Sequence, residues 1–293
     1  MENQQIRRQA LFDALETRVL VLDGAMGTML QQRHLTADDF GGPMLEGCNE
    51  NLVLTRPDVI LDVHRAYYAS GADIVETNSF GSTRLVLAEY DLANLSYELN
   101  FGAAKLAREA AEEYSKPGRL RFVAGSMGPT TKAITVTGGV TFPDLIENYF
   151  LQAKGLLEGG ADILLLETCQ DTRNVKAGLL AIHRLGKELG YPVPVMVSGT
   201  IEPMGTMLAG QTADAFYASI SHADLLSVGL NCATGPEFMT DHIRSIHELA
   251  TTRVSCYPNA GLPDEEGKYA ETPTSLAAQL EKFVDHGWLN FIG

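Results

Sequence analysis

Three side chains that could do chemistry lie at the ends of short apolar runs in this 293-residue sequence. Cys232 and Glu167 each lie at the end of such a run, and Asn259 directly follows another. A cysteine in this position can act as a nucleophile, bind a metal or pack as an inert side chain. A carboxylate after an apolar run is costly to bury unless a cation compensates it, either a basic side chain or the ammonium group of a ligand. Asn259 can belong to the same site or to a simple turn.

A glycine-rich segment, Asp-Gly-Ala-Met-Gly at residues 23–27, follows another apolar run. Glycine permits tight turns, so the segment can be a plain connection between a strand and a helix. It can equally form a nest of backbone N–H groups that binds an anion such as a carboxylate. No Gly-Lys-Ser or Gly-Lys-Thr follows, which excludes a phosphate-binding loop of the nucleotide-binding type.

Short apolar runs alternate with longer segments of helical periodicity along the whole chain. The runs are rich in Val, Ile and Leu and are bounded by Gly, Pro or Asp, a pattern typical of buried parallel strands. They lie at residues 19–23, 72–77, 122–126, 161–168, 193–200, 225–232, 253–258 and 289–293. Between them the spacing predicts helices at residues 57–70, 95–115, 142–158, 171–189, 212–223, 235–252 and 273–286, after a first helix at 5–17.

Eight strands with helices between them predict a single (β/α)₈ TIM barrel over residues 1–293. An open doubly wound sheet is the alternative, but no G-x-G-x-x-G loop follows any strand. In a barrel the carboxyl ends of the strands form one mouth, so the polar residues described above would meet there. The sequence stops in or just after the eighth strand, without an eighth helix. We therefore expect a truncated barrel, a fragment of a larger multidomain enzyme.

Composition excludes several classes of partner. The formal net charge of −15 disfavours nucleic acid, because a phosphate backbone requires a basic face. No apolar run approaches the ~18 residues of a membrane span, so no membrane association is expected. The polar start lacks the apolar core of a signal peptide. The four cysteines contain no Cys-x-x-Cys pair, and we expect reduced thiols in a cytoplasmic protein.

Six segments together resemble the homocysteine-binding domain of cobalamin-dependent methionine synthases. They occur in the same order and cover nearly the whole chain. The wider family includes betaine–homocysteine methyltransferase and S-methylmethionine-dependent enzymes. The segments are Leu-Asp-Gly-Ala-Met-Gly-Thr at 22–28, Gly-Cys-Asn-Glu-Asn at 47–51, Gly-Ala-Asp-Ile-Val-Glu-Thr-Asn-Ser-Phe at 71–80, Leu-Glu-Thr at 166–168, Gly-Leu-Asn-Cys at 229–232 and Pro-Asn-Ala-Gly-Leu-Pro at 258–263.

The resemblance implies a (β/α)₈ barrel whose zinc ion is held by three cysteines. Cys232 corresponds to the first of them. The other two form a pair in a Gly-Gly-Cys-Cys segment whose first glycine corresponds to Gly293, so the pair itself is absent from this chain. Asn259 corresponds to a fourth ligand that the homocysteine sulfur replaces. Because only two of these ligands are present, we expect zinc to be absent from this chain or weakly bound.

The same resemblance assigns the substrate-binding residues. The strand-four glutamate would bind the amino group of homocysteine, and backbone N–H groups of the first loop would bind its carboxylate. The residues that it implies are Asp23, Gly24, Ala25, Met26, Gly27, Thr77, Asn78 and Glu167.

The resemblance finally implies a methyltransferase that makes methionine. Zinc would hold homocysteine as a thiolate, which then takes a methyl group from methylcobalamin. The cobalamin-binding and folate-binding domains would belong to the same full-length chain, so this fragment alone would be inactive. One alternative is a single-domain methyltransferase that uses S-methylmethionine or betaine. Another is a non-catalytic barrel fragment that serves as a binding module.

Overall fold

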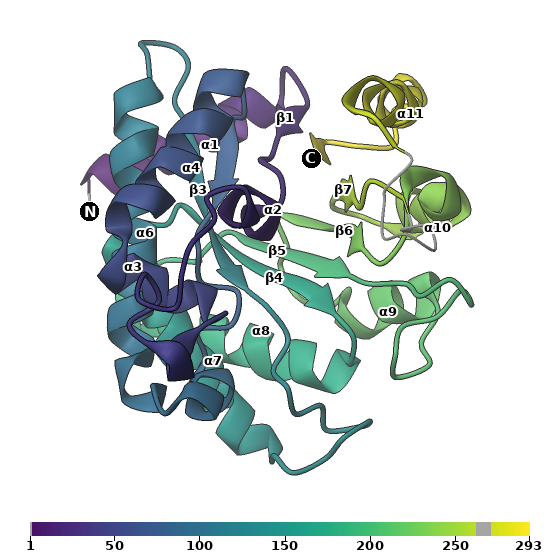
Figure 1. Ribbon diagram of the computed structural model, residues 1–293. Coiled ribbons are helices and arrows are strands. Elements are labelled where there is room, and N and C mark those ends of the chain that lie inside the picture. The colour runs from purple at the N-terminus through teal and green to yellow at the C-terminus, as the bar shows by residue number, and fades with distance from the viewer. Residues whose placement is uncertain (1, 262–270) are drawn as a thin grey trace.

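The computed structural model describes residues 2–261 and 271–293, and it confirms the predicted TIM barrel. All eight predicted strands are present and parallel, with helices around them (Figure 1). The strands are β1 Leu20–Val21, β2 Ile74–Glu76, β3 Phe122–Met127, β4 Ile163–Cys169, β5 Val195–Gly199, β6 Ser227–Cys232, β7 Arg253–Pro258 and β8 Phe291–Ile292.

The strand order is that of a barrel. The hydrogen-bonded order is β1-β8-β7-β6-β5-β4-β3-β2, so neighbours in the sheet are neighbours in the chain except where β8 meets β1. A single bridge between Leu22 and Ile74 joins β1 to β2 and nearly closes the ring. This order excludes the doubly wound sheet, whose strand order would reverse at a switch point.

The seven predicted connecting helices are present, after the N-terminal helix. The long helices are α1 Glu2–Leu15, α4 Pro57–Ser70, α6 Ser96–Tyr114, α7 Phe142–Gly159, α8 Thr172–Leu189, α9 Ala213–Ile220, α10 Pro236–Leu249 and α11 Pro273–Asp285. Shorter elements, which the sequence did not predict, lie in the first two connections. They are α2 Met26–Gln31, α3 Leu52–Thr55, α5 Arg84–Leu87 and the 3₁₀ turns Pro43–Leu45, Asn49–Asn51, Ala88–Tyr90 and Ala93–Leu95.

Capping residues set the helix ends. The Asp171 side chain accepts a hydrogen bond of 2.9 Å from the Arg173 N–H at the start of α8. Gly190 ends that helix with a φ of 79°, in the left-handed region that favours glycine. Thr141 and Asp144 form a reciprocal capping box at the start of α7.

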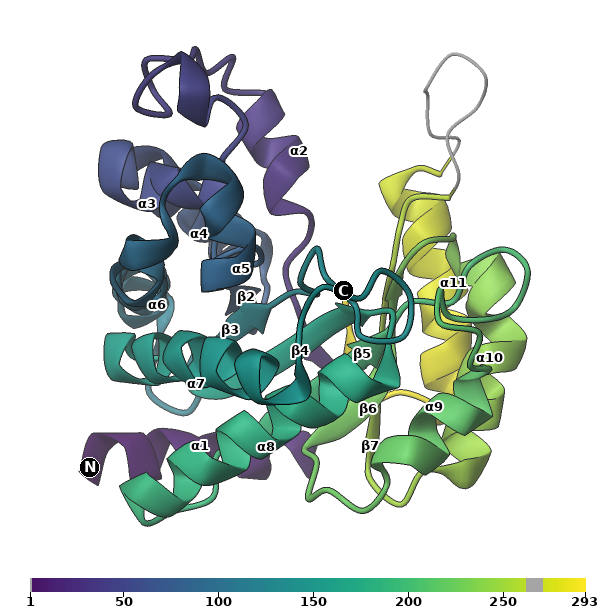
Figure 2. The same ribbon diagram turned by 90° about the horizontal axis from the view of Figure 1, so that it is seen from below.

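Side chains alternate between the two faces of each strand, so the hydrophobic core has two parts. Inward side chains such as Ile163, Leu165 and Phe291 fill the barrel, while outward ones pack under the helices. Leu11 and Leu15 of α1 join the inner cluster, so α1 covers the amino-terminal end of the barrel. Figure 2 shows α1 and α2 at opposite ends of the strands. Among the described residues, no helix has the length and apolar content that a membrane span requires.

Candidate active site at the barrel mouth

A pocket of about 380 Å³ opens at the carboxyl ends of the strands. Every residue that the sequence suggested for substrate or metal binding lines it. These residues are Asp23, Gly24, Ala25, Met26, Gly27, Thr77, Asn78, Glu167, Cys232 and Asn259. The structure thus brings together five separate segments of the chain, as the barrel topology requires.

Four carboxyl groups line this pocket, and three of them, from Asp23, Glu76 and Glu167, influence one another's pKa values. Both side-chain oxygens of Asp23 accept from the Glu76 N–H, at 3.1 Å each. The Ser126 hydroxyl donates to the Glu167 carboxylate. No Lys, Arg or His of residues 2–261 and 271–293 forms an ion pair with any of the three. The cluster therefore has no positively charged partner among the residues that the structure describes.

Burial raises the pKa values of all three groups. The pKa of Glu167 rises to about 7, although the Ser126 hydrogen bond opposes the shift. The pKa values of Asp23 and Glu76 lie well above the usual range, first because of burial and then because of the neighbouring carboxylates. A cation placed among them would reverse these shifts, since it favours the charged forms.

Cys232 occupies a strained position at the end of β6. Its φ is 57°, and the φ of Thr168 at the end of β4 is 52°, both in the left-handed region. Such a conformation costs about 1–3 kcal/mol for a residue other than glycine. The Asn231 amide holds both positions, because it donates to Thr168 Oγ1 at 2.8 Å and to Cys232 Sγ at 3.1 Å. It also accepts from the Thr168 N–H at 2.9 Å.

The environment of Cys232 bears on whether its thiol acts as a nucleophile, a metal ligand or an inert side chain. Burial, followed by the charge of Glu167, raises the pKa of the thiol. A protonated thiol is a weak nucleophile at neutral pH. Cys232 also lines the pocket rather than the core. The raised pKa therefore disfavours an unaided nucleophile, and the position in the pocket disfavours inert packing in the core.

The first loop presents backbone donors to the same pocket. The N–H groups of Gly24 and Ala25 donate to no residue that the structure describes. Those of Met26 and Gly27 lie in the first turn of α2, where a helix has no internal acceptors. Gly24 lies against Tyr67, whose hydroxyl would be 3.1 Å from an added Cβ, so a larger residue would crowd this loop.

The described residues do not complete a zinc site. Of the four cysteines, only Cys232 lines the pocket, while Cys48, Cys169 and Cys256 are buried elsewhere. Across residues 2–261 and 271–293, no group of three or more His, Cys, Asp or Glu has metal-binding geometry. Asn259 lines the pocket, but the last two residues of its segment, 262 and 263, lie outside the described part. One thiol and one amide supply fewer ligands than zinc requires.

Several pocket residues lie at the predicted strand ends but were given no role from the sequence. Glu76, Ser126, Thr168, Asn231 and Tyr257 all line it. A signal for Glu76 was present, because it lies two residues after the inward Ile74 and so points to the same side of its strand. Asn231 gave no such signal, since its role depends on a contact with a strand 63 residues away.

Comparison with known proteins places this barrel in a family. Residues 20–293 match the profile of a family described as homocysteine S-methyltransferase. The chain belongs to the homocysteine S-methyltransferase family. The match covers the whole barrel, including every segment that lines the pocket, so the chain carries a homocysteine S-methyltransferase domain.

Solved structures support the fold of this homocysteine S-methyltransferase domain. The homocysteine methyltransferase MmuM from Escherichia coli, in its oxidized form, has a TM-score of 0.79 at 23% identity, covering 97% of this chain and 94% of that one. Its metallated form has a TM-score of 0.76 at 23% identity, over 97% and 93%. The carboxyl transferase domain of Rhizobium etli pyruvate carboxylase shares the fold more distantly, with a TM-score of 0.53 at 13% identity over 94% and 39%.

Proposed function

We propose that the mouth pocket binds homocysteine and presents its thiol for methylation. The ammonium group would lie among Asp23, Glu76 and Glu167. The carboxylate would accept from the backbone N–H groups of residues 24–27, and the thiol would point toward Cys232. The observation that carries this proposal is the cluster of three carboxyl groups without a cation in the described chain.

The contribution of these residues is to bind and orient. Methyl transfer forms a bond between the homocysteine sulfur and the methyl carbon, breaks the bond from that carbon to the donor, and releases the thiol proton. Holding the amino acid by both charged ends fixes the sulfur relative to an incoming donor, which lowers the entropic part of the barrier. Glu167 and Asn231 are buried, so the lower part of the pocket is shielded from water.

The second part of the proposal concerns a zinc site in the same pocket. Cys232 and Asn259 would contribute to a site that needs further thiolates, and the resemblance implies a pair of cysteines in the Gly-Gly-Cys-Cys segment that begins at Gly293. Gly293 itself lines the pocket. Because the described donors are too few, we predict that residues 1–293 hold no tightly bound zinc. A zinc titration that gives one tight site per chain, lost in Cys232→Ser, would contradict this prediction.

For the methyl donor we propose methylcobalamin, bound by another domain of a full-length chain. The support is the resemblance of the mouth segments to cobalamin-dependent methionine synthases. S-Methylmethionine and betaine are the alternative donors. Methionine formation from homocysteine with each donor, in the presence of zinc, separates these cases. We expect no turnover with either small donor, and turnover with one of them would overturn the assignment of methylcobalamin.

Isothermal titration of the protein with L-homocysteine tests the binding proposal directly. We expect one molecule bound per chain at pH 8, which is above the pKa of about 7 of Glu167. Glu167→Gln should weaken binding, while Glu237→Gln, an exposed glutamate of α10, serves as the matched control. Equal affinity in both variants would contradict the placement of the ammonium group.

A further inference from the structure

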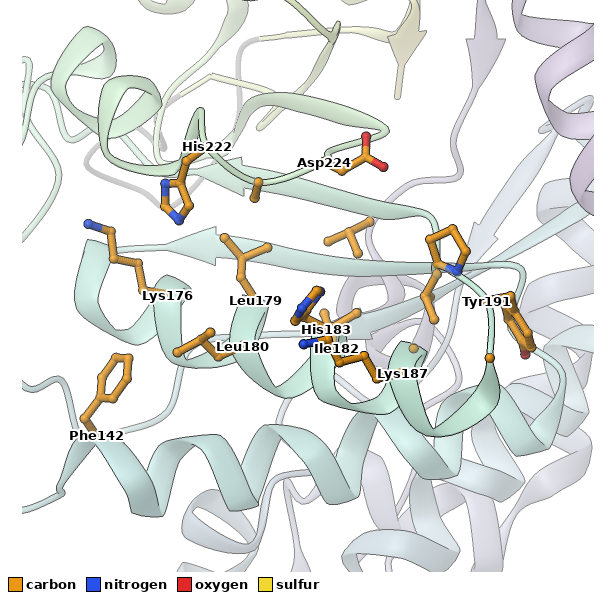
Figure 3. A pocket seen from close by; sticks show the side chains of 16 residues that line it. Phe142, Lys176, Leu179, Leu180, Ile182, His183, Lys187, Tyr191, His222 and Asp224 are labelled. Carbon is orange, nitrogen blue, oxygen red and sulfur yellow. The ribbon is translucent and has the colours of Figure 1, made fainter.

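A second cavity lies on the flank of the barrel, away from the mouth. It is a groove of about 770 Å³, twice the size of the mouth pocket, between α8 and residues 222–224 (Figure 3). The proposed methyltransferase function does not use any of its residues. An inference about the groove therefore stands independently of that function.

The groove exists because two neighbouring helices differ in length. Helix α8 has 18 residues and α9 only 8, which correspond to roughly 27 and 12 Å. On one side α8 packs along α7, where Arg184 pairs with Glu147 at 2.5 Å. On the other side α9 ends at Ile220, and the following segment lies opposite the remaining turns of α8. Val193 and Val195 at the start of β5 lie beneath the opening.

The walls of the groove are largely apolar. Leu180 of α8 is 48% exposed although it lies in the middle of the helix. Leu179, Ile182, Phe142 and Tyr191 add further apolar lining. Figure 3 shows the α8 side chains on one wall, with His222 and Asp224 opposite them. A concave apolar surface of this kind, with a few polar groups, is typical of a binding site.

The groove is basic on a protein that is acidic as a whole. Lys176, His183, Lys187 and His222 line it, against the single carboxylate of Asp224. None of these four basic side chains forms an ion pair with a residue in the described part of the chain. The whole sequence has 37 Asp and Glu against 22 Lys and Arg, whereas the groove has two lysines against one aspartate, so the charge balance is reversed there. An occupant with carboxylates would complement it.

We propose that this groove docks an amphipathic helix of a partner protein, with an apolar face flanked by carboxylates. Lys176 and Lys187 lie eleven residues apart on α8, about 16 Å along the helix axis. A small anion would reach only one of them, whereas a helix of three turns spans both. Its apolar stripe would lie on Leu179 and Leu180, in the space that the short α9 leaves open.

A designed peptide tests the proposal on the intact chain. The probe is a labelled 14-residue helical peptide with leucines on one face and glutamates beside them, and its binding is followed by fluorescence anisotropy. The double variant Lys176→Glu/Lys187→Glu should weaken binding about tenfold. The matched control Lys105→Glu/Lys282→Glu changes the net charge equally at exposed positions on α6 and α11 and should leave the affinity unchanged.

Further measurements distinguish the proposed helix from other possible occupants of the groove. A peptide with lysines in place of the glutamates should bind the double variant better than the wild-type chain. Leu180→Asp should weaken binding of the original peptide without altering the melting temperature, because this side chain is half exposed. Absence of saturable binding would overturn the proposal, as would equal loss in the control variant. A dimer that the double variant converts to a monomer would also overturn it, because a second copy would then cover the groove.

Discussion

Buried carboxylates at the two ends of the barrel differ in whether they have a basic partner. At the amino-terminal end, Asp73 pairs with Arg18 at 2.5 Å and with Arg121 at 2.9 Å. Asp162 pairs there with Arg7 and Arg108, at 2.9 and 2.5 Å. At the carboxyl-terminal end, the cluster of three carboxyl groups has no basic partner among the described residues.

This difference appears in the pKa values. Burial alone would raise the pKa of Asp73, but hydrogen bonds and charges from Arg18 and Arg121 outweigh it and lower the pKa. The pKa of Glu167, by contrast, rises to about 7. Folding therefore supplies the counter-charges at the amino-terminal end of the barrel, the closed end that α1 covers. At the open end it leaves them to a ligand, which is the pattern expected of a binding site for an ammonium group.

The largest effect should come from the closed end. Asp73→Asn leaves the buried Arg121 without its carboxylate, which should lower the free energy of unfolding by about 3–5 kcal/mol. Urea denaturation measures this loss. The control Asp241→Asn breaks an exposed pair with Arg244 and should cost less than about 1 kcal/mol. If both variants were equally stable, the contrast between the ends would have no energetic basis.

A neutral substitution at the open end should act on binding and not on stability. Glu167→Gln should weaken homocysteine binding about 100-fold, because a buried charged partner of the ammonium group is lost. The free energy of unfolding should stay the same or increase, since a repelling charge is removed. A loss of stability like that of Asp73→Asn would show that Glu167 is a structural residue.

The pH dependence of stability sharpens the same contrast. The pKa of Glu167 is raised in the folded protein, so its contribution is fully present below the unfolded value near 4.5 and is lost as the pH rises through 7. Glu167→Gln should therefore nearly match the wild-type chain at pH 4.5 and exceed it by about 3 kcal/mol at pH 8. Thermal melts of the ligand-free proteins across this range measure the difference. A constant gap between the two proteins at every pH would argue against a raised pKa.

The smallest effect should come from the hydroxyl beside Glu167. Ser126→Ala removes a hydrogen bond that favours the charged carboxylate, worth about 1 kcal/mol. Homocysteine affinity should fall roughly fivefold at pH 7, with less effect at pH 8.5 where Glu167 is ionised in any case. An equal loss at both pH values would indicate that Ser126 contacts the substrate itself.

Much of this molecule could be predicted from its sequence, for identifiable reasons. The buried strands are continuous apolar runs, and helix ends such as Asp171 and Gly190 carry strong capping signals. The short helices α2, α3 and α5 were missed because four to six residues cannot show helical periodicity. Helix α9 ends at Ile220, three residues before its predicted end. Residues 222–224 therefore line the groove instead of continuing the helix.

The predicted pocket residues converge because all of them lie at the carboxyl ends of strands or just after them. The carboxyl cluster was only partly predicted, since Asp23 and Glu167 were expected to bind the substrate but Glu76 was given no role. The contact between the Asp23 carboxylate and the Glu76 N–H joins residues 53 positions apart, which no local pattern reveals. The hydrogen bonds from the Asn231 amide to Thr168 and Cys232 could not be predicted for the same reason.

The central claim is that the open end of the barrel binds an ammonium group. Calorimetric titration with L-homocysteine and with 4-mercaptobutanoate, which lacks only the amino group, tests it most directly. At pH 8 we predict that the analogue binds about 100-fold more weakly than homocysteine, since the carboxyl cluster then has no cation. Equal affinities for the two thiols would contradict the account.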